Sequence, residues 1–201
     1  MKVVSGISRG RRLKGSKAGI RPTSEKVKEA LFDIIGEKVK GAIFLDLYAG
    51  TGAIGIEALS RGGEKAVFVE SDPSLRRVIR ENVSSLGLGE KADVVGQDAG
   101  RFLNNAMKKA ERFDIIFLDP PYHTGEMDRI IKILSKGDVL NEDGVLVAEH
   151  FKKKKLPEEV GLLRLLKEYR YGDTVLTFYK IPLHPPFSKG DNIFPSLAKR
   201  G

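Results

Sequence analysis

The sequence predicts an α/β fold of the Rossmann-like type, with a mostly parallel seven-stranded sheet closed by an antiparallel C-terminal hairpin. Two observations predict it. Short apolar runs alternate with amphipathic stretches between residues 25 and 149, as expected when parallel strands are joined by helices. Further on, two strand-like runs flank Gly172-Asp173, which is a hairpin turn signal. At 201 residues the chain has room for one sizeable domain of this kind.

The expected elements follow one another in a regular order. Thr23 or Ser24 can cap a first helix, in which apolar residues such as Val27 and Leu31 fall on one face. Strands and helices then alternate over strand 43–48, helix 53–60, strand 66–70, helix 74–86, strand 92–96, helix 99–110, strand 114–118, helix 125–135 and strand 144–149. The hairpin strands occupy residues 162–171 and 174–181.

A glycine-rich loop follows the first strand. Gly50, Gly52 and Gly55 form the pattern G-x-G-x-x-G between strand 43–48 and helix 53–60, the context of a nucleotide-binding loop. Glycines at such positions let the backbone approach a ligand and adopt a positive φ. Proteins that bind NAD, FAD or S-adenosylmethionine all use similar loops, so the pattern alone leaves the ligand open.

Acidic residues lie at or just past the ends of the first three strands. Asp46 precedes the glycines, where it would repel a pyrophosphate but could hold the ammonium group of S-adenosylmethionine. Glu70 lies 20 residues past Gly50, the spacing of a residue that accepts hydrogen bonds from a ribose diol. Asp98 could accept from an adenine amino group, or it could only cap helix 99–110.

The tetrapeptide Asp119-Pro120-Pro121-Tyr122 follows the apolar run 115–118, at the carboxyl end of the fourth strand. The Asp119 carboxylate and a proline-fixed carbonyl can accept from an exocyclic amine, while the Tyr122 ring stacks on a planar base. Alternatively, the tetrapeptide is only a stiff turn. Together with the acids on the preceding strands, it indicates a methyl-donor pocket beside a base pocket.

Composition excludes several classes of site. The chain has no cysteine, which excludes disulfides and thiolate metal sites. Its histidines lack the spacing of metal ligands, so no metal is expected; they are His123, His150 and His184. No apolar run reaches the roughly 18 residues of a membrane span. We expect a soluble, cytoplasmic monomer.

The positive charge is concentrated at the N-terminus. Residues 1–28 hold nine Lys or Arg residues and one acid, whereas the rest of the chain is balanced. A flexible basic arm over residues 1–22 predicts a nucleic-acid phosphate backbone as partner, the alternative being a solubilising tail. Residues 152–155 are four further lysines, which form either a solvated loop or part of the same rim. The methyltransferase domain is expected at 23–182 and a Pro/Gly-rich tail at 183–201.

Several motifs together resemble the bacterial 16S rRNA guanine-N2 methyltransferase family of the RsmD type over residues 1–182. They are Arg21-Pro22-Thr23 leading into Lys28-Glu29-Ala30-Leu31-Phe32, Leu45-Asp46-Leu47-Tyr48-Ala49-Gly50-Thr51-Gly52, Glu57-Ala58-Leu59-Ser60-Arg61-Gly62 and Leu118-Asp119-Pro120-Pro121-Tyr122. The last element is shared with DNA adenine methyltransferases. The first helix departs from the family pattern at Lys26, Lys28 and Asp33, and the arm departs from it at Ser8.

The resemblance implies specific roles for these residues. S-adenosylmethionine would be bound by Asp46, Tyr48, Gly50, Gly52, Glu70 and Asp98. The catalytic residues Asp119, Pro120 and Tyr122 would hold a flipped guanine, and Arg9, Arg11, Arg12 and Arg21 would contact 16S rRNA within an assembling 30S subunit. The alternatives are a DNA adenine-N6 methyltransferase and a non-catalytic RNA-binding module. An NAD-dependent oxidoreductase is disfavoured by Asp46.

Overall fold

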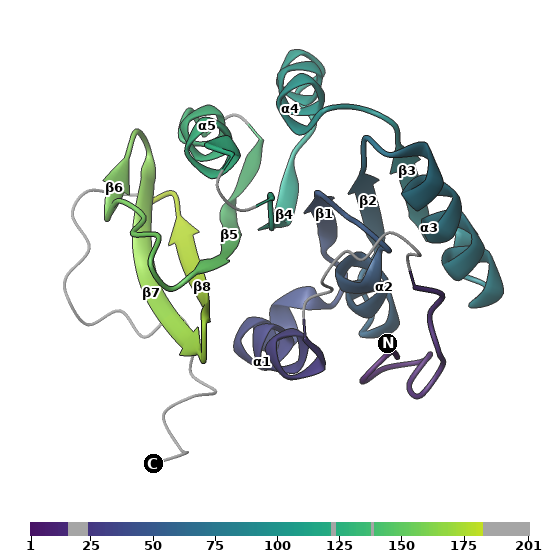
Figure 1. The fold of residues 1–201 in the computed structure, drawn as a ribbon. Coiled ribbons are helices and arrows are strands. Elements are labelled where there is room, and N and C mark those ends of the chain that lie inside the picture. The colour runs from purple at the N-terminus through teal and green to yellow at the C-terminus, as the bar shows by residue number, and fades with distance from the viewer. Residues whose placement is uncertain (16–23, 122–123, 138, 183–201) are drawn as a thin grey trace.

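The computed structural model describes residues 1–15, 24–121, 124–137 and 139–182, which form a single twisted sheet with helices on both faces (Figure 1). The strands are β1 (Ile43–Leu47), β2 (Lys65–Val69), β3 (Ala92–Val95), β4 (Phe113–Leu118), β5 (Leu140–Phe151), β6 (Glu159–Val160), β7 (Leu163–Tyr171) and β8 (Thr174–Lys180). The helices are α1 (Glu25–Ile35), α2 (Ala53–Ser60), α3 (Pro73–Ser85), α4 (Ala99–Lys108) and α5 (Glu126–Leu134), with short 3-10 helices η1 (Gly36–Val39) and η2 (Gly89–Lys91).

The strand order creates a ligand-binding edge. The order is β3-β2-β1-β4-β5-β8-β7-β6, with β1 to β5 parallel and β8 antiparallel to β5. After β3 the chain returns to the other side of β1, so the carboxyl ends of β1 and β4 are neighbours. Such a reversal opens a crevice at the carboxyl edge of the sheet, because the helices that follow the two strands lie on opposite faces.

The two faces of the sheet are covered by different helices (Figure 1). Helices α1, α2 and α3 pack on one face, which we call the α1 face, while α4 and α5 pack on the other, the α5 face. Strand residues alternate between them: in β1, Phe44 belongs to the core of the α1 face, and Leu45 and Leu47 belong to that of the α5 face.

Local sequence signals fix where three helices begin. The Ser24 side chain accepts a hydrogen bond from the N–H of Val27 at 3.2 Å and so caps α1. Asp72 caps α3 by accepting from the N–H of Ser74 at 2.7 Å, and Pro73 occupies the first helical position. Asp98 caps α4 through the N–H of Arg101 at 3.0 Å. Each cap satisfies a backbone donor that the helix itself leaves unpaired.

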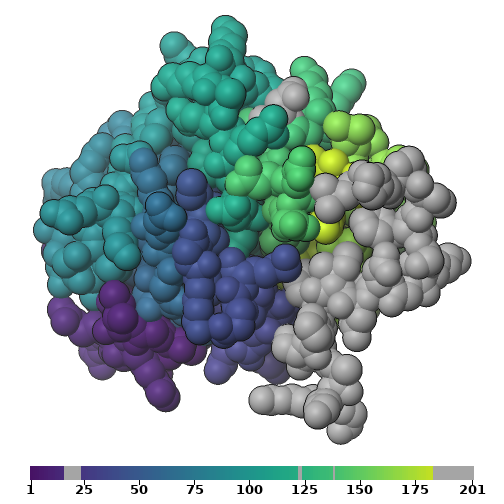
Figure 2. All heavy atoms as spheres, turned by 180° about the vertical axis from the view of Figure 1, so that it is seen from behind, coloured from purple at the N-terminus to yellow at the C-terminus, as the bar shows by residue number. Residues whose placement is uncertain are grey.

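Residues 1–15 pack against the domain, although the sequence predicts a flexible arm. Val3 and Leu13 are buried, and the segment folds back on itself where the N–H of Val3 donates to the carbonyl of Arg11 at 2.9 Å. The N–H of Ile7 donates to the carbonyl of Ser60 at the end of α2, at 2.8 Å. In the space-filling view, these purple residues gather at one corner of the molecule (Figure 2). Their packing makes residues 1–15 part of the folded structure.

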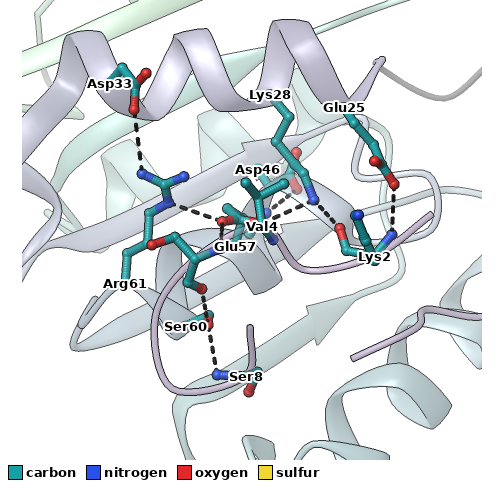
Figure 3. Close-up of polar contacts among 12 residues, drawn as sticks. Lys2, Val4, Ser8, Glu25, Lys28, Asp33, Asp46, Glu57, Ser60 and Arg61 are labelled. Carbon is teal, nitrogen blue, oxygen red and sulfur yellow. Dashed lines mark hydrogen bonds and ion pairs between the residues drawn. The ribbon is translucent and has the colours of Figure 1, made fainter. Parts of the chain in front are cut away.

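A buried ion pair anchors this segment to α1 and α2 (Figure 3). Lys28 Nζ lies 2.9 Å from Glu57 Oε2, and both side chains are fully buried. Glu57 also accepts from the N–H groups of Val4 and Ser5, at 2.8 and 2.9 Å, while Lys28 donates to the carbonyl of Lys2 at 2.6 Å.

Further contacts complete the anchor. Arg61 Nε donates to Glu57 Oε1 at 3.0 Å. Ser60 Oγ donates to the carbonyl of Ser5 at 2.6 Å and accepts from the N–H of Ser8 at 3.0 Å. Burial by itself would raise the pKa of Glu57, but the N–H of Val4 and the Lys28 ammonium lower it, so the carboxylate is ionised.

Two strands differ from the sequence prediction. The sheet has eight strands in the described residues instead of seven, because the two-residue edge strand β6 is too short to show any periodicity. Strand β5 begins at Leu140, four residues before the predicted start, and the register of β4 with β5 shifts between Phe113 and Ile115. This irregularity interrupts the alternation on which the prediction depends.

Replacing Lys28 by Met should destabilise the protein strongly. The substitution removes the cation from a buried Glu57, and breaking a buried ion pair costs about 3 kcal/mol or more. Lys26→Met makes the same change on the exposed side of α1 and should leave the free energy of unfolding within about 0.5 kcal/mol. Urea denaturation of both variants measures the difference, and equal midpoints would show that the pair is unimportant.

Candidate active site

Acidic residues line up along the carboxyl edge of the sheet. Glu70 follows β2, Asp46 is the penultimate residue of β1, and Asp119 follows β4. Asp98 comes three residues after β3, at the outer end of this row. Because the strand order is β3-β2-β1-β4, the structure brings the predicted acids together, with Asp46 and Asp119 on neighbouring strands.

The glycine loop is shaped by two of these acids. Gly50 and Gly52 have φ values of 56° and 80°, in the region that favours glycine. Asp46 Oδ2 accepts from the N–H of Gly55 at 3.0 Å, and Glu70 Oε2 accepts from the N–H of Gly50 at 2.9 Å. Both carboxylates therefore have a structural role in holding the loop.

Gly55 has a different role from the other two glycines. A Cβ atom on Gly55 would lie 2.3 Å from the Phe68 ring, so only glycine lets α2 pack this closely on β2. The third glycine of the pattern therefore allows close packing of α2 on β2.

Tyr48 is held in an unusual conformation at the start of the loop. Its φ of 66° is rare for a residue other than glycine and is typical of functional sites. Its hydroxyl donates to Glu126 Oε2 on α5 at 2.6 Å. This contact ties the glycine loop to the helix on the opposite face of the sheet.

Arg129 connects the same helix to the end of the acid row. Its guanidinium donates to Glu126 at 2.7 Å and to Asp98 Oδ2 at 3.0 Å. Asp98 thus caps α4 with one oxygen, as the alternative prediction states, and pairs with Arg129 through the other. The sequence analysis missed Glu126 and Arg129. Nothing in the residues of helix 125–135 indicates that Glu126 contacts Tyr48, which lies 78 positions earlier in the chain.

Three carboxylates lie on the α1 face of this edge. Leu118 and Ala148 are paired residues of β4 and β5 and belong to the core of the α5 face. Because strand residues alternate, Asp119 and Glu149, one position further on, point to the α1 face, as Asp46 does. Asp46 is 2% exposed and Glu149 is 4% exposed. The sequence analysis missed Glu149, although an acid at the end of an apolar strand is a usable signal.

Burial changes the ionisation of these groups. Loss of water around Asp46 and, to a smaller extent, the charge of Glu70 raise its pKa to about 7, although the hydrogen bond from Gly55 acts in the opposite direction. Burial likewise raises the pKa of Asp119 well above its usual range, and the negative charges of Glu149 and Asp46 add to the effect. In the described part of the chain, no Lys or Arg forms an ion pair with Asp46 or Asp119. Among the described residues, acidic side chains therefore gather at this edge without a basic side chain to neutralise Asp46 or Asp119.

The predicted RNA-binding arginines lie elsewhere. Arg11 Nη2 donates to the carbonyl of Ser85, the last residue of α3, at 3.0 Å. That helix starts at the carboxyl edge and its 13 residues span about 20 Å, so Arg11 lies near the opposite end of the sheet. Arg9 and Arg12 are exposed on the same folded segment.

The remaining predicted site residues are Pro120, Tyr122 and Arg21. Pro120 is buried beside Asp119, while Tyr122 and Arg21 lie outside the described residues.

Comparison with known proteins identifies the family. Residues 1–180 match the family described as "Conserved hypothetical protein 95". The chain belongs to this family. It is 41% identical over 181 residues to YlbH of Bacillus subtilis, whose name describes a candidate rRNA methyltransferase, and the match covers 90% of this chain and 98% of that relative.

A second relative and a solved structure agree with this assignment. The chain is 33% identical over 168 residues to ribosomal RNA small subunit methyltransferase D of Haemophilus influenzae, covering 82% of this chain and 86% of that protein. These matches confirm the predicted RsmD-type family. A structure from Escherichia coli, titled as a candidate methyltransferase, has 28% identity and a TM-score of 0.81 over 92% of this chain and 99% of that one. The predicted methyltransferase fold is confirmed.

The described residues contain neither a membrane-spanning helix nor a metal site. None of their helices is long and apolar enough to cross a membrane. No group of three or more His, Cys, Asp or Glu side chains among them could hold a metal ion.

Replacing Asp46 by Asn should change how stability depends on pH. The folded pKa of about 7 lies above the ordinary value of 3.8, so the stability that protonated Asp46 contributes is lost as the pH rises through 7. Relative to wild type, Asp46→Asn should therefore gain about 2–3 kcal/mol of unfolding free energy between about pH 5 and pH 8. Urea denaturation at both pH values tests this, and a constant difference between the two proteins would contradict it.

Proposed function

We propose that the protein transfers a methyl group from S-adenosylmethionine to the N2 amine of a specific guanine in 16S rRNA, on an assembling 30S subunit, and acts as a monomer. Its family and the names of its relatives support rRNA methylation. The acids at the carboxyl edge of the sheet support the cofactor, and Asp119-Pro120 supports an amine as methyl acceptor. The basic segment at residues 1–15 and the lysines at 152–155 agree with a polyanionic substrate.

The observation that best supports this function is the set of carboxylates at the carboxyl ends of β1, β4 and β5, of which Asp46 and Glu149 are buried and Asp119 is half-buried. An edge with Asp46, Asp119 and Glu149 favours a cationic ligand and opposes a pyrophosphate. S-adenosylmethionine carries a sulfonium and an ammonium group, so its charge fits. NAD and FAD would place phosphates beside Asp46.

The residues around the glycine loop suit the parts of this cofactor. Gly50 and Gly52 let backbone approach it, and Asp46 would accept from its ammonium group. Glu70 can accept from a ribose diol in addition to its backbone donors, because each carboxylate oxygen has two lone pairs. Asp98 would accept from the adenine amine, and Tyr48, positioned by Glu126, would line the same pocket.

Asp119 would position and deprotonate the amine that is methylated. Its carboxylate and the carbonyl of Pro120 would accept the two amine hydrogens, and Tyr122 would stack on the base. The bound cofactor supplies an electrophilic methyl group on sulfur. As the new nitrogen–carbon bond forms, the sulfur–methyl bond would break and its electron pair would stay on sulfur, which leaves as a neutral thioether. The amine would then be acidic, and its proton would pass to the ionised form of Asp119, whose raised pKa suits it as an acceptor. Most of the acceleration would come from positioning the reactants.

The test is transfer of labelled methyl from S-adenosylmethionine to unmethylated 30S particles, protein-free 16S rRNA, duplex DNA and buffer alone. We expect N2-methylguanosine from the particles or the rRNA, identified by mass. N6-methyladenine from DNA would show the alternative substrate, because Asp-Pro-Pro-Tyr is shared with DNA adenine methyltransferases. No transfer together with no cofactor binding would leave only the non-catalytic RNA-binding alternative.

Replacing Asp119 by Ala should lower kcat by about 100-fold or more while cofactor affinity stays within a few fold. The substitution removes an acceptor that acts on the reacting amine, an effect of the size found for other preorganised polar contacts. Asp143→Ala removes an exposed carboxylate before the parallel part of β5 and is the matched control. Methyl-transfer kinetics and calorimetric cofactor titration measure the two quantities. Activity of Asp119→Ala close to that of Asp143→Ala would refute the role of Asp119.

A further inference from the structure

A cavity lies beside the Pro120–Pro121 pair. Its volume is about 580 Å³, and it is formed where α5 starts and β5 ends. The lining residues that matter here are Pro120, Pro121, Met127, Phe151, Lys153 and Lys154. Asp119 is not among its lining residues.

The proline pair links this cavity to Asp119. Asp119 points to the α1 face, whereas Met127 belongs to α5 and packs in the core of the α5 face. Pro120 and Pro121, which directly follow Asp119 in the chain, therefore lead from this side chain to the lining of the cavity. If a base of an RNA strand binds at Asp119, the neighbouring nucleotide of that strand would lie close to this cavity.

The loop at residues 152–155, which we call the lysine loop, lies beside this cavity and includes lysines that form no ion pair with another described residue. Residues 152–155 directly follow β5, so they lie at the same edge as Asp119. Lys152 pairs with Asp173 at 2.6 Å, and Lys154 pairs with Asp128, the acid that also lines the cavity. Lys153 and Lys155 are exposed and form no ion pair within the described ranges. Their charges are available to phosphates.

The lysine loop is better placed than the N-terminal arginines to contact the RNA next to the methylated nucleotide. Arg11 is bonded to the far end of α3, about 20 Å from the edge that holds Asp119. The purple N-terminal residues and the green residues of β5 also lie apart in both overall views (Figures 1 and 2). Phosphates adjoining a base at Asp119 are therefore within reach of the lysine loop and out of reach of Arg11.

We propose that this cavity and the lysine loop bind the single-stranded RNA backbone beside the methylated nucleotide. Lys153 and Lys155 hold its phosphates, and the neighbouring base enters the cavity against Phe151 and Pro121. The inference rests on the proposed function, since it assigns the substrate strand of that same reaction. Lys154 neutralises Asp128, which removes the carboxylate that would otherwise repel the backbone.

The test is the double variant Lys153→Gln/Lys155→Gln. Its matched control is Lys38→Gln/Lys91→Gln, which removes two exposed lysines that precede β1 and β3 at the opposite edge of the sheet. Binding of protein-free 16S rRNA is measured by filter retention at several salt concentrations, and methyl transfer to the same RNA is measured separately. Thermal unfolding checks that both variants fold.

For the loop variant we expect Kd and KM for RNA to rise about 10-fold, with kcat at saturating RNA and cofactor Kd within about two-fold of wild type. The slope of log Kd against log salt should fall by about 1.4, which corresponds to two lost phosphate contacts on a single strand. The control should match wild type. A loop variant that binds RNA like the control overturns this inference.

The outcomes that would refute the proposed function differ from those that would refute the role of the lysine loop. If wild-type protein transfers no methyl to RNA or 30S particles while the loop variant still shows weakened RNA binding, the lysine loop is an RNA contact and the assigned reaction is wrong. If methyl transfer proceeds and the two double variants bind RNA equally, the reaction stands and the loop assignment is wrong.

Discussion

The structure depends on burying an ionised carboxylate within the protein. Glu57 is fully buried, and it is accommodated because Lys28, Arg61 and the backbone N–H groups of Val4 and Ser5 surround it. These partners come from α1, α2 and the N-terminal segment, so one side chain holds three parts of the chain together (Figure 3). An uncompensated charge in this position would cost several kcal/mol. The packing of α1 against the sheet, and the path of residues 1–15, therefore depend on this cluster.

The pKa values of two acids at the carboxyl edge of the sheet shift in the opposite direction. The cations and N–H groups around Glu57 lower its pKa, whereas burial raises the pKa of Asp46 and Asp119. The first arrangement is complete without a ligand. In the second, burial favours the neutral acids, and a cationic ligand would stabilise their ionised forms; acids with perturbed pKa values of this kind cluster at functional sites. The contrast separates an acid that maintains the fold from acids that we propose serve a reaction.

Much of this architecture could be predicted from sequence because its signals are local. Helix α2 has the predicted bounds, and Ser24 and Asp98 cap helices as their positions indicate. The contacts that were missed join residues far apart in the chain. Glu57 and Lys28 are 29 positions apart, and no periodicity reports that they meet. The same is true of Arg129 with Asp98, and of Arg11, whose charge suggested a partner but whose place beside Ser85 came only from the fold.

The position of β8 has a consequence for synthesis of the protein. This strand is the last of those in the described residues, yet it lies between β5 and β7 and pairs with β5 from Leu146 to Phe151. Until the ribosome has released it, β5 is an uncovered edge, and Glu149 lacks one of its two neighbouring strands. The surroundings of Glu149 at the carboxyl edge are therefore completed only after nearly the whole described chain has emerged. A nascent chain stalled before Thr174 would expose an apolar strand edge that invites association with other chains.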